Sequence, residues 1–152
     1  AWVQGLFGAL RVDYSRLSRE LVGSVRARRT VSGTDAKSCL ASCASARRIV
    51  EGLNGGLRKA FERYVDDIDR VIAEMTRVLK RRGHAFVVVA DSTVRGVEVR
   101  NHAVILELAS YHGLEGQAIG HREIDPSRRQ MPIKGGLSGR IKREELLLLR
   151  KA

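Results

Sequence analysis

The stretch Met75–Asp91, MTRVLKRRGHAFVVVAD, decides the fold because it passes from a helical pattern to a strand pattern within a few residues. Up to Leu79, apolar residues recur at steps of three and four, as on one face of an α-helix. Gly83 is the residue type that most readily ends a helix. Residues 85–90 are then all apolar and rich in valine, which favours a strand covered on both faces. We therefore predict a long amphipathic helix followed directly by a buried strand.

The same criteria extend this order of elements along the chain. The apolar stripe of the long helix consists of Phe61, Tyr64, Val65, Ile68, Val71, Ile72, Met75, Val78 and Leu79. The expected helices span residues 14–22, 36–53, 57–82 and 101–112. The expected strands span residues 85–90, 117–124 and 144–150, with a loop over residues 125–139 before the last of them. We predict an α/β chain with two parts, a basic helical region over residues 1–60 and an α/β domain over residues 61–152.

The charge of the chain indicates a polyanionic partner. Its 152 residues carry a formal net charge of +11, and 30% of them are charged. Most of the basic residues are arginines, whose planar guanidinium matches phosphate oxygens. Nucleic acid is therefore the expected partner, with DNA favoured over RNA and no membrane involved. A basic surface without a dedicated ligand is the alternative.

The two cysteines and the start of the chain bear on its compartment. Cys39 and Cys43 stand four apart, on one face of an expected helix, and no second pair completes a zinc site. We expect both to be reduced and the protein to be cytoplasmic. The opening residues lack the basic and apolar regions of a signal peptide, and no run approaches the roughly 20 apolar residues that span a bilayer. The chain also starts without methionine, so we expect that it begins inside a longer reading frame.

Several motifs together resemble one enzyme family. Arg77-Val78-Leu79-Lys80 and Gly83, followed by the aliphatic strand, resemble the passage into the fifth strand of class I S-adenosylmethionine-dependent methyltransferases. Asp91-Ser92 with Arg95-Gly96 resembles the "GDS…RG" segment after that strand. Asp125–Pro132 is similar to the "IPsRRxxMP" segment of amino-group-specific DNA methylases, and Arg143–Lys151 is similar to their final strand. The resemblance covers residues 61–151, and it extends more weakly to a helix following their catalytic loop at Asp13–Gly23.

The resemblance implies a partial Rossmann-like methyltransferase sheet, in the order helix-strand-helix-strand-strand, preceded by a helical region. It also implies the carboxyl-terminal part of a DNA methyltransferase acting on adenine N6 or cytosine N4, with S-adenosylmethionine as cofactor. Two expected motifs are missing. No strand leads into a Gly-x-Gly turn for the cofactor, and Gln4–Phe7, in the place of the catalytic loop, lacks both prolines and the polar first residue. We therefore expect a chain that is incomplete or inactive by itself, and we assign no catalytic residue.

Two other functions remain open at this point. One is part of an RNA guanine-N2 methyltransferase, which has the same fold. The other is a basic nucleic-acid-binding module without catalysis. The four histidines show no metal-ligand spacing, so we expect no metal site. Self-association through an exposed sheet edge is a further expectation, because a partial sheet leaves its edge strand unpaired.

The candidate nucleic-acid-binding residues belong to two groups. Asp91 and Ser92 follow a strand that we expect to be parallel, and the carboxyl ends of such strands form the ligand edge of an open α/β sheet. Both residue types also favour turns, which is the structural alternative. Arg95 follows in the same segment. The second group lies in the loop before the last strand, where phosphate contact and simple solvation are both open, and comprises Arg128, Arg129, Lys134 and Arg140.

Overall fold

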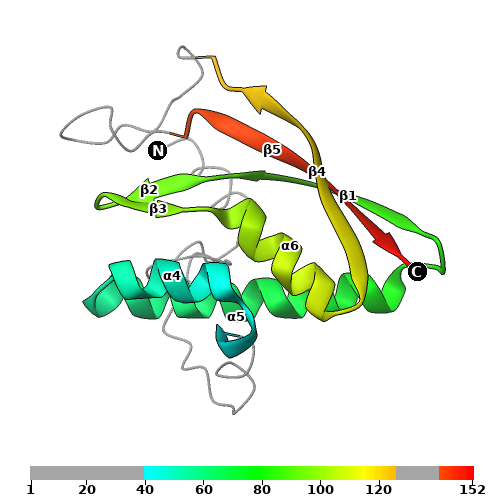
Figure 1. The fold of residues 1–152 in the computed structure, drawn as a ribbon, viewed down its shortest axis with the longest axis horizontal. Coiled ribbons are helices and arrows are strands. Elements are labelled where there is room, and N and C mark those ends of the chain that lie inside the picture. The colour runs from blue at the N-terminus through cyan, green and yellow to red at the C-terminus, as the bar shows by residue number, and fades with distance from the viewer. Residues whose placement is uncertain (1–39, 126–140) are drawn as a thin grey trace, which may run out of the picture.

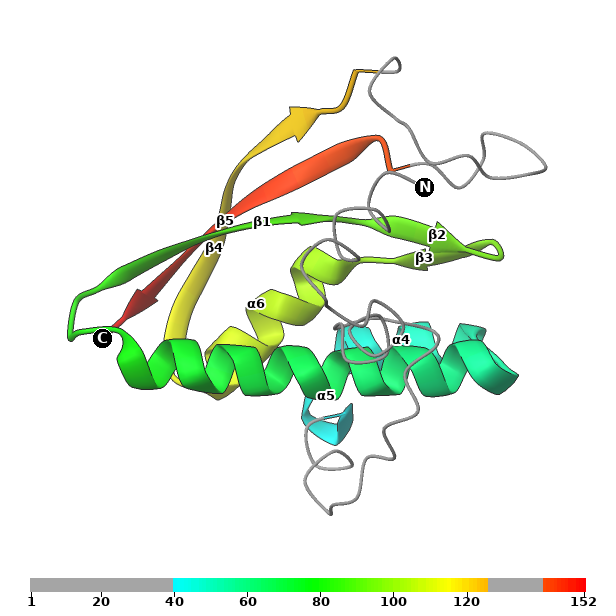
Figure 2. The same cartoon turned by 180° about the vertical axis from the view of Figure 1, so that it is seen from behind.

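The computed structural model describes residues 40–125 and 141–152. The expected helix over residues 14–22 and nearly all of the loop over residues 125–139 lie outside this part. The helices are α4 (Ala44–Gly52), α5 (Gly55–Val78) and α6 (Asn101–Tyr111). The strands are β1 (His84–Ala90), β2 (Ser92–Val94), β3 (Val97–Val99), β4 (Leu114–Glu123) and β5 (Arg143–Lys151). The described residues form two layers, with the helices on one side of the sheet (Figures 1 and 2).

The larger sheet has the strand order β1-β5-β4, and both pairings are antiparallel. Since β1 and β4 both run opposite to β5, they run in the same direction as each other. The chain travels from β1 to β4 through a short β2–β3 hairpin and α6, and it then returns as β5 between them (Figure 1). The prediction of a mixed α/β chain is confirmed. We expected β1 to pair with a parallel neighbour. This expectation is wrong for β5, because the returning last strand lies beside β1 and runs antiparallel to it.

The predicted bounds of α5, α6, β1, β4 and β5 lie within four residues of those observed, but α4 begins at Ala44, after an extended Cys43, instead of belonging to one helix over residues 36–53, and the long helix ends sooner. α5 stops at Val78 because Leu79 has extended backbone angles. Its last carbonyl groups receive a cation from elsewhere in the fold, since Lys151 Nζ on β5 donates to Thr76 O at 2.6 Å and to Leu79 O at 3.0 Å. A positive charge at a helix carboxyl end stabilises the helix dipole.

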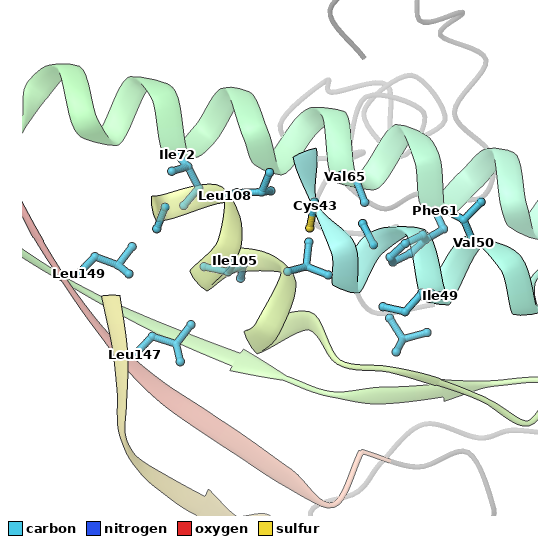
Figure 3. Close-up of a cluster of buried hydrophobic side chains, with 14 of the residues drawn as sticks. Cys43, Ile49, Val50, Phe61, Val65, Ile72, Ile105, Leu108, Leu147 and Leu149 are labelled. Atoms are coloured by element: carbon cyan, nitrogen blue, oxygen red, sulfur yellow. The ribbon is translucent and has the colours of Figure 1, made fainter. Parts of the chain in front are cut away.

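A single hydrophobic core joins the helices to the inner face of the sheet (Figure 3). α6 lies between the other helices and the sheet, and its Val104, Leu108 and Ala109 are fully buried. Leu147 and Leu149 project from β5 into the same core and are also inaccessible to solvent. The remaining buried apolar residues include Ala46, Ile49, Val50, Phe61, Val65, Ile72 and Ile105. None of the helices in the described part of the chain is both long and apolar enough to cross a bilayer.

β1 is covered on one face only, which corrects the prediction of a strand buried on both faces. Its side chains alternate in exposure, and Phe86 and Val88 are 67% and 60% exposed. Val87 and Val89, on the other face, pack against the core. The helices α4, α5 and α6 all lie on that inner side (Figure 2). An unbroken apolar run permits burial on both faces of a strand. Burial of both faces also requires a layer of structure on each side of the sheet, and the strand sequence does not determine whether that layer is present.

Candidate functional site

The carboxyl end of β1 is held to the start of α6 by three hydrogen bonds. Asn101 Nδ2 donates to Ala90 O at 2.8 Å, and the backbone N–H of His102 donates to Asp91 Oδ1 at 3.2 Å. The second carboxylate oxygen of Asp91 lies 2.6 Å from His102 Nδ1. Asp91 therefore satisfies one of the free N–H groups in the first turn of α6 and also orients the imidazole. Asp91 therefore has the structural role that aspartate favours at the end of a strand. It has this role at the position where we expected a ligand site.

A pocket of about 250 Å³ opens beside these residues, between α5 and the β2–β3 hairpin. Phe61 and Tyr64 form one wall, with ring centroids 5.9 Å apart. Ser92 and Asn101 supply polar groups. The other lining residues are Leu53, Leu57, Ala60, Val94 and Val99. An apolar pocket with a few polar groups is the usual form of a site for a flat organic ligand.

A second, slightly larger hollow lies at the opposite end of the sheet. It has a volume of about 280 Å³, and its lining includes His84, Glu115, Gln117 and Arg150. It has no aromatic or aliphatic wall comparable to that around Tyr64. We regard the pocket beside Ser92 as the candidate site because its apolar walls include aromatic side chains and enclose two polar ones.

The amide of Asn101 contains an acceptor that the fold leaves unused. Its Nδ2 must face the Ala90 carbonyl, because an amide oxygen cannot donate, and this fixes the orientation of the group. Its Oδ1 is buried and has no hydrogen-bond partner. An unpartnered buried acceptor costs on the order of 1–3 kcal/mol. A ligand with an N–H donor would offset that cost.

The electrostatics of the pocket come from Asp91 and from arginines outside it. Burial raises the pKa of the Tyr64 phenol, and the nearby negative charge of Asp91 raises it further, so the phenol remains protonated at neutral pH. The hydrogen bond and charge of Glu98 raise the pKa of Arg100, and the two side chains lie 3.0 Å apart. Among the described residues, Arg95 forms no such ion pair. Its cation is therefore available to a ligand.

Arg95 occupies the tip of the β2–β3 hairpin, next to the pocket-lining Val94. Arg95 and Gly96 have φ angles of 49° and 86°, which are those of a tight type I′ turn. Such a turn favours Asn, Asp or Gly at its first position, so an arginine there is unusual. The Arg95 side chain is exposed.

The structure brings together three of the seven predicted site residues. Asp91, Ser92 and Arg95 all lie around the carboxyl end of β1 and its hairpin. Arg128, Arg129, Lys134 and Arg140 lie outside the described residues. Sequence reasoning missed Phe61, Tyr64 and Asn101 as site residues. We had assigned the two aromatic residues to the apolar stripe of their helix. The β2–β3 hairpin forms the opposite wall of the pocket, and Arg95-Gly96 is its only signal in the sequence.

A second polar cluster, at the start of α4, is structural. The Glu107 carboxylate accepts hydrogen bonds from the backbone N–H and the hydroxyl of Ser45. Burial alone would raise the pKa of Glu107, but these hydrogen bonds outweigh it and the pKa is lowered. Cys43 beside them is a free, buried thiol whose pKa burial raises to about 12. It is therefore unreactive at neutral pH, because the thiolate is the reactive form.

Comparison with known proteins adds no relative. No protein-family model matches the chain, and neither a curated protein nor a solved structure matches it. Within residues 40–125 and 141–152, no three histidine, cysteine or acidic side chains gather as metal ligands.

Proposed function

We propose that this chain is the carboxyl-terminal part of an S-adenosylmethionine-dependent DNA methyltransferase that acts on an exocyclic amine, adenine N6 or cytosine N4. In this proposal the chain contributes contacts to the target base and to the DNA backbone. The methyl donor would be held by residues outside the described part. The proposal rests on the motif resemblance over residues 61–151 together with the two structural arguments below.

The observation that carries the proposal is the order of the strands. The resemblance assigned β1 to the fifth strand of the methyltransferase sheet and β5 to its last strand. These two segments are direct neighbours, paired from His84 with Arg150 to Ala90 with Glu144. Because β5 runs opposite to both of its neighbours, β1 and β4 keep a common direction, as the resemblance implies for strands of a parallel methyltransferase sheet. A simple antiparallel meander would instead have placed β4 beside β1.

The pocket at the end of β1 supports recognition of a flat base. Enzymes that modify a base turn it out of the duplex and bind it in a pocket by stacking and by hydrogen bonds to its edge. Tyr64, which is half-buried, offers the stacking surface, which is worth about 1–3 kcal/mol per base, and the buried Phe61 supports its ring from the core. The unused acceptor of Asn101 and the hydroxyl of Ser92 suit the N–H donors of an exocyclic amine. Arg95 and the net charge of +11 suit the surrounding phosphates.

The described residues do not fit S-adenosylmethionine. The only glycine-rich segment in residues 40–125 or 141–152 that could be compared with a cofactor turn is Gly52–Gly56. It connects α4 to α5, and no strand precedes it. Gly55 and Gly56 begin α5 itself. We therefore derive no methyl-transfer step for this chain.

Fluorescence anisotropy with labelled DNA duplexes tests the proposal. Extruding a mismatched base costs less than extruding a paired one, so a protein with a base pocket binds a mismatched duplex more tightly. We expect the chain to prefer the mismatched duplex severalfold, and we expect Tyr64→Ala to remove that preference. Tyr111→Ala is the matched control, because Tyr111 is 58% exposed on α6 and does not line the pocket.

The second candidate, a basic module without base recognition, is favoured by the exposed Arg95 and by the overall charge. It predicts DNA affinity that falls steeply with salt but does not differ between matched and mismatched duplexes. Equal affinity for both duplexes, unchanged by Tyr64→Ala, would therefore replace the methyltransferase proposal with the module. A preference for structured RNA over both duplexes would favour the RNA methyltransferase variant.

A further inference from the structure

We propose that the outer edge of β1 pairs with the outer edge of β1 in a second copy of this chain, in an antiparallel register centred on Val87. The two three-stranded sheets would then form one continuous sheet of six strands. This inference goes beyond the proposed function and concerns the chain by itself, because in a wider methyltransferase sheet the preceding strand would occupy the outer edge of β1.

The two edges of the sheet differ in how they are protected. The edge strand β4 contains Gly116 and Gly120, has a register shift between Ala118 and Gly120, and carries charges at Glu115 and Arg122. Glycines, bulges and charges are the features by which natural sheets prevent further strand pairing. β4 therefore resembles a true terminal edge.

β1 has none of these features. Its seven residues, HAFVVVA, contain no glycine, proline, lysine, arginine or acidic residue. Within residues 40–125 and 141–152, no strand lies along its outer edge. An edge strand that is regular, valine-rich and uncharged is a template for another strand.

The pattern of exposed side chains selects a register. With Val87 opposite Val87 of the second copy, Phe86 lies opposite Val88, and both belong to the exposed face. Leu146 and Leu148, opposite Val88 and Phe86 on β5, extend the same face in each copy. The apolar strip would then run without interruption across the two sheets. A shift by one residue would place the exposed side chains of the two copies on opposite faces, so it is disfavoured.

The charges at the two ends of β1 select the antiparallel direction. Lys80, Arg81 and Arg82 form an exposed basic turn just before the strand. Asp91 follows the strand, and Glu144 lies opposite Ala90 on β5. Antiparallel pairing brings the basic turn of one copy near Asp91 and Glu144 of the other, which pair with His102 and Arg122 of their own chain. Parallel pairing would place the two basic turns side by side, which is unfavourable for a chain with a net charge of +11.

Light scattering after size-exclusion chromatography, over a range of chain concentrations, tests the proposal. We expect a mass of about twice the 16.8 kDa of one chain at high concentration, with dissociation on dilution. Val88→Lys is expected to remain monomeric, because it places a charge beside Phe86 of the second copy. Ile119→Lys is the matched control at the β4 edge, where Ile119 is 44% exposed, and it is expected to dimerise like the unaltered chain. Circular dichroism verifies that both variants are folded.

Hydrogen exchange locates the contact. In the dimer, the β1 amides that do not bond to β5 should become protected as the concentration rises. A monomer at every concentration overturns the proposal. This is the result expected if another polypeptide segment already occupies the outer edge of β1. A dimer whose outward β1 amides still exchange freely, or one that Ile119→Lys disrupts and Val88→Lys does not, overturns it as well.

Discussion

At the scale of single residues, buried polar groups explain how α4 is attached to the rest of the fold. α4 has no side-chain cap of its own, and its first N–H groups are satisfied from α6 by Glu107 through Ser45. The Cys43 thiol lies next to this carboxylate and is 1% exposed. No sequence pattern could have revealed the pairing, because the two segments are 62 residues apart.

The Cys43 thiol makes the stability of the fold sensitive to alkaline pH. Its pKa is raised from 9.0 to about 12, so the folded state retains a proton that the unfolded chain releases. The stabilisation is complete below pH 9 and is lost as the pH rises from 9 towards 12, by at most about 1.4 kcal/mol per pH unit. We predict that urea midpoints fall more steeply between pH 8 and pH 10.5 for the unaltered chain than for Cys43→Ala. Parallel slopes would show that the thiol is not the responsible group.

At the scale of elements, the helix-to-strand passage behaves largely as its sequence predicts. α5, β1, α6 and β5 all form within a few residues of their expected bounds, because each has a strong periodic or apolar pattern. The β2–β3 hairpin was not predicted, since strands of three residues are too short to show a period. The face that β1 exposes also could not be predicted, because it depends on where the helices pack.

Gly83 is required by the tight passage from α5 to β1. A Cβ at this position would lie 2.7 Å from the backbone oxygen of Lys80, which cannot move as a flexible side chain would. We predict that Gly83→Ala lowers the free energy of unfolding by roughly 1–3 kcal/mol, measured by urea denaturation. Gly56→Ala is the control, since a Cβ there meets no atom within 4 Å. It should be neutral or stabilising by up to about 1 kcal/mol. Equal losses in both variants would contradict this explanation.

At the scale of the whole molecule, the described residues form a three-stranded antiparallel sheet, a hairpin and a pocket beside the hairpin. Asp91, Ser92 and Arg95 could be placed at the site from sequence, because they directly follow β1. Tyr64 and Phe61 could not, because only the packing of α5 against the hairpin brings them there. The charge of +11 favours a polyanionic partner, but it does not indicate which surface would bind one.

The division of roles in the proposed function leads to a prediction about the cofactor. Since no cofactor turn follows a strand in the described part, we expect isothermal titration of S-adenosylmethionine into this chain to show no tight binding. The same sample should bind DNA, with an affinity that decreases steeply between about 50 and 200 mM salt. Micromolar binding of S-adenosylmethionine would refute the view that the methyl-donor site lies outside these residues.

The most direct test of the account is to find where an extruded base binds. A DNA duplex with one photoreactive base at a mismatched position is irradiated in complex with the chain, and the crosslinked peptide is identified by mass spectrometry. The account predicts crosslinks to the α5 peptide that contains Phe61 and Tyr64, or to the hairpin that begins at Ser92. Crosslinks that avoid both segments, with DNA still bound, would contradict it.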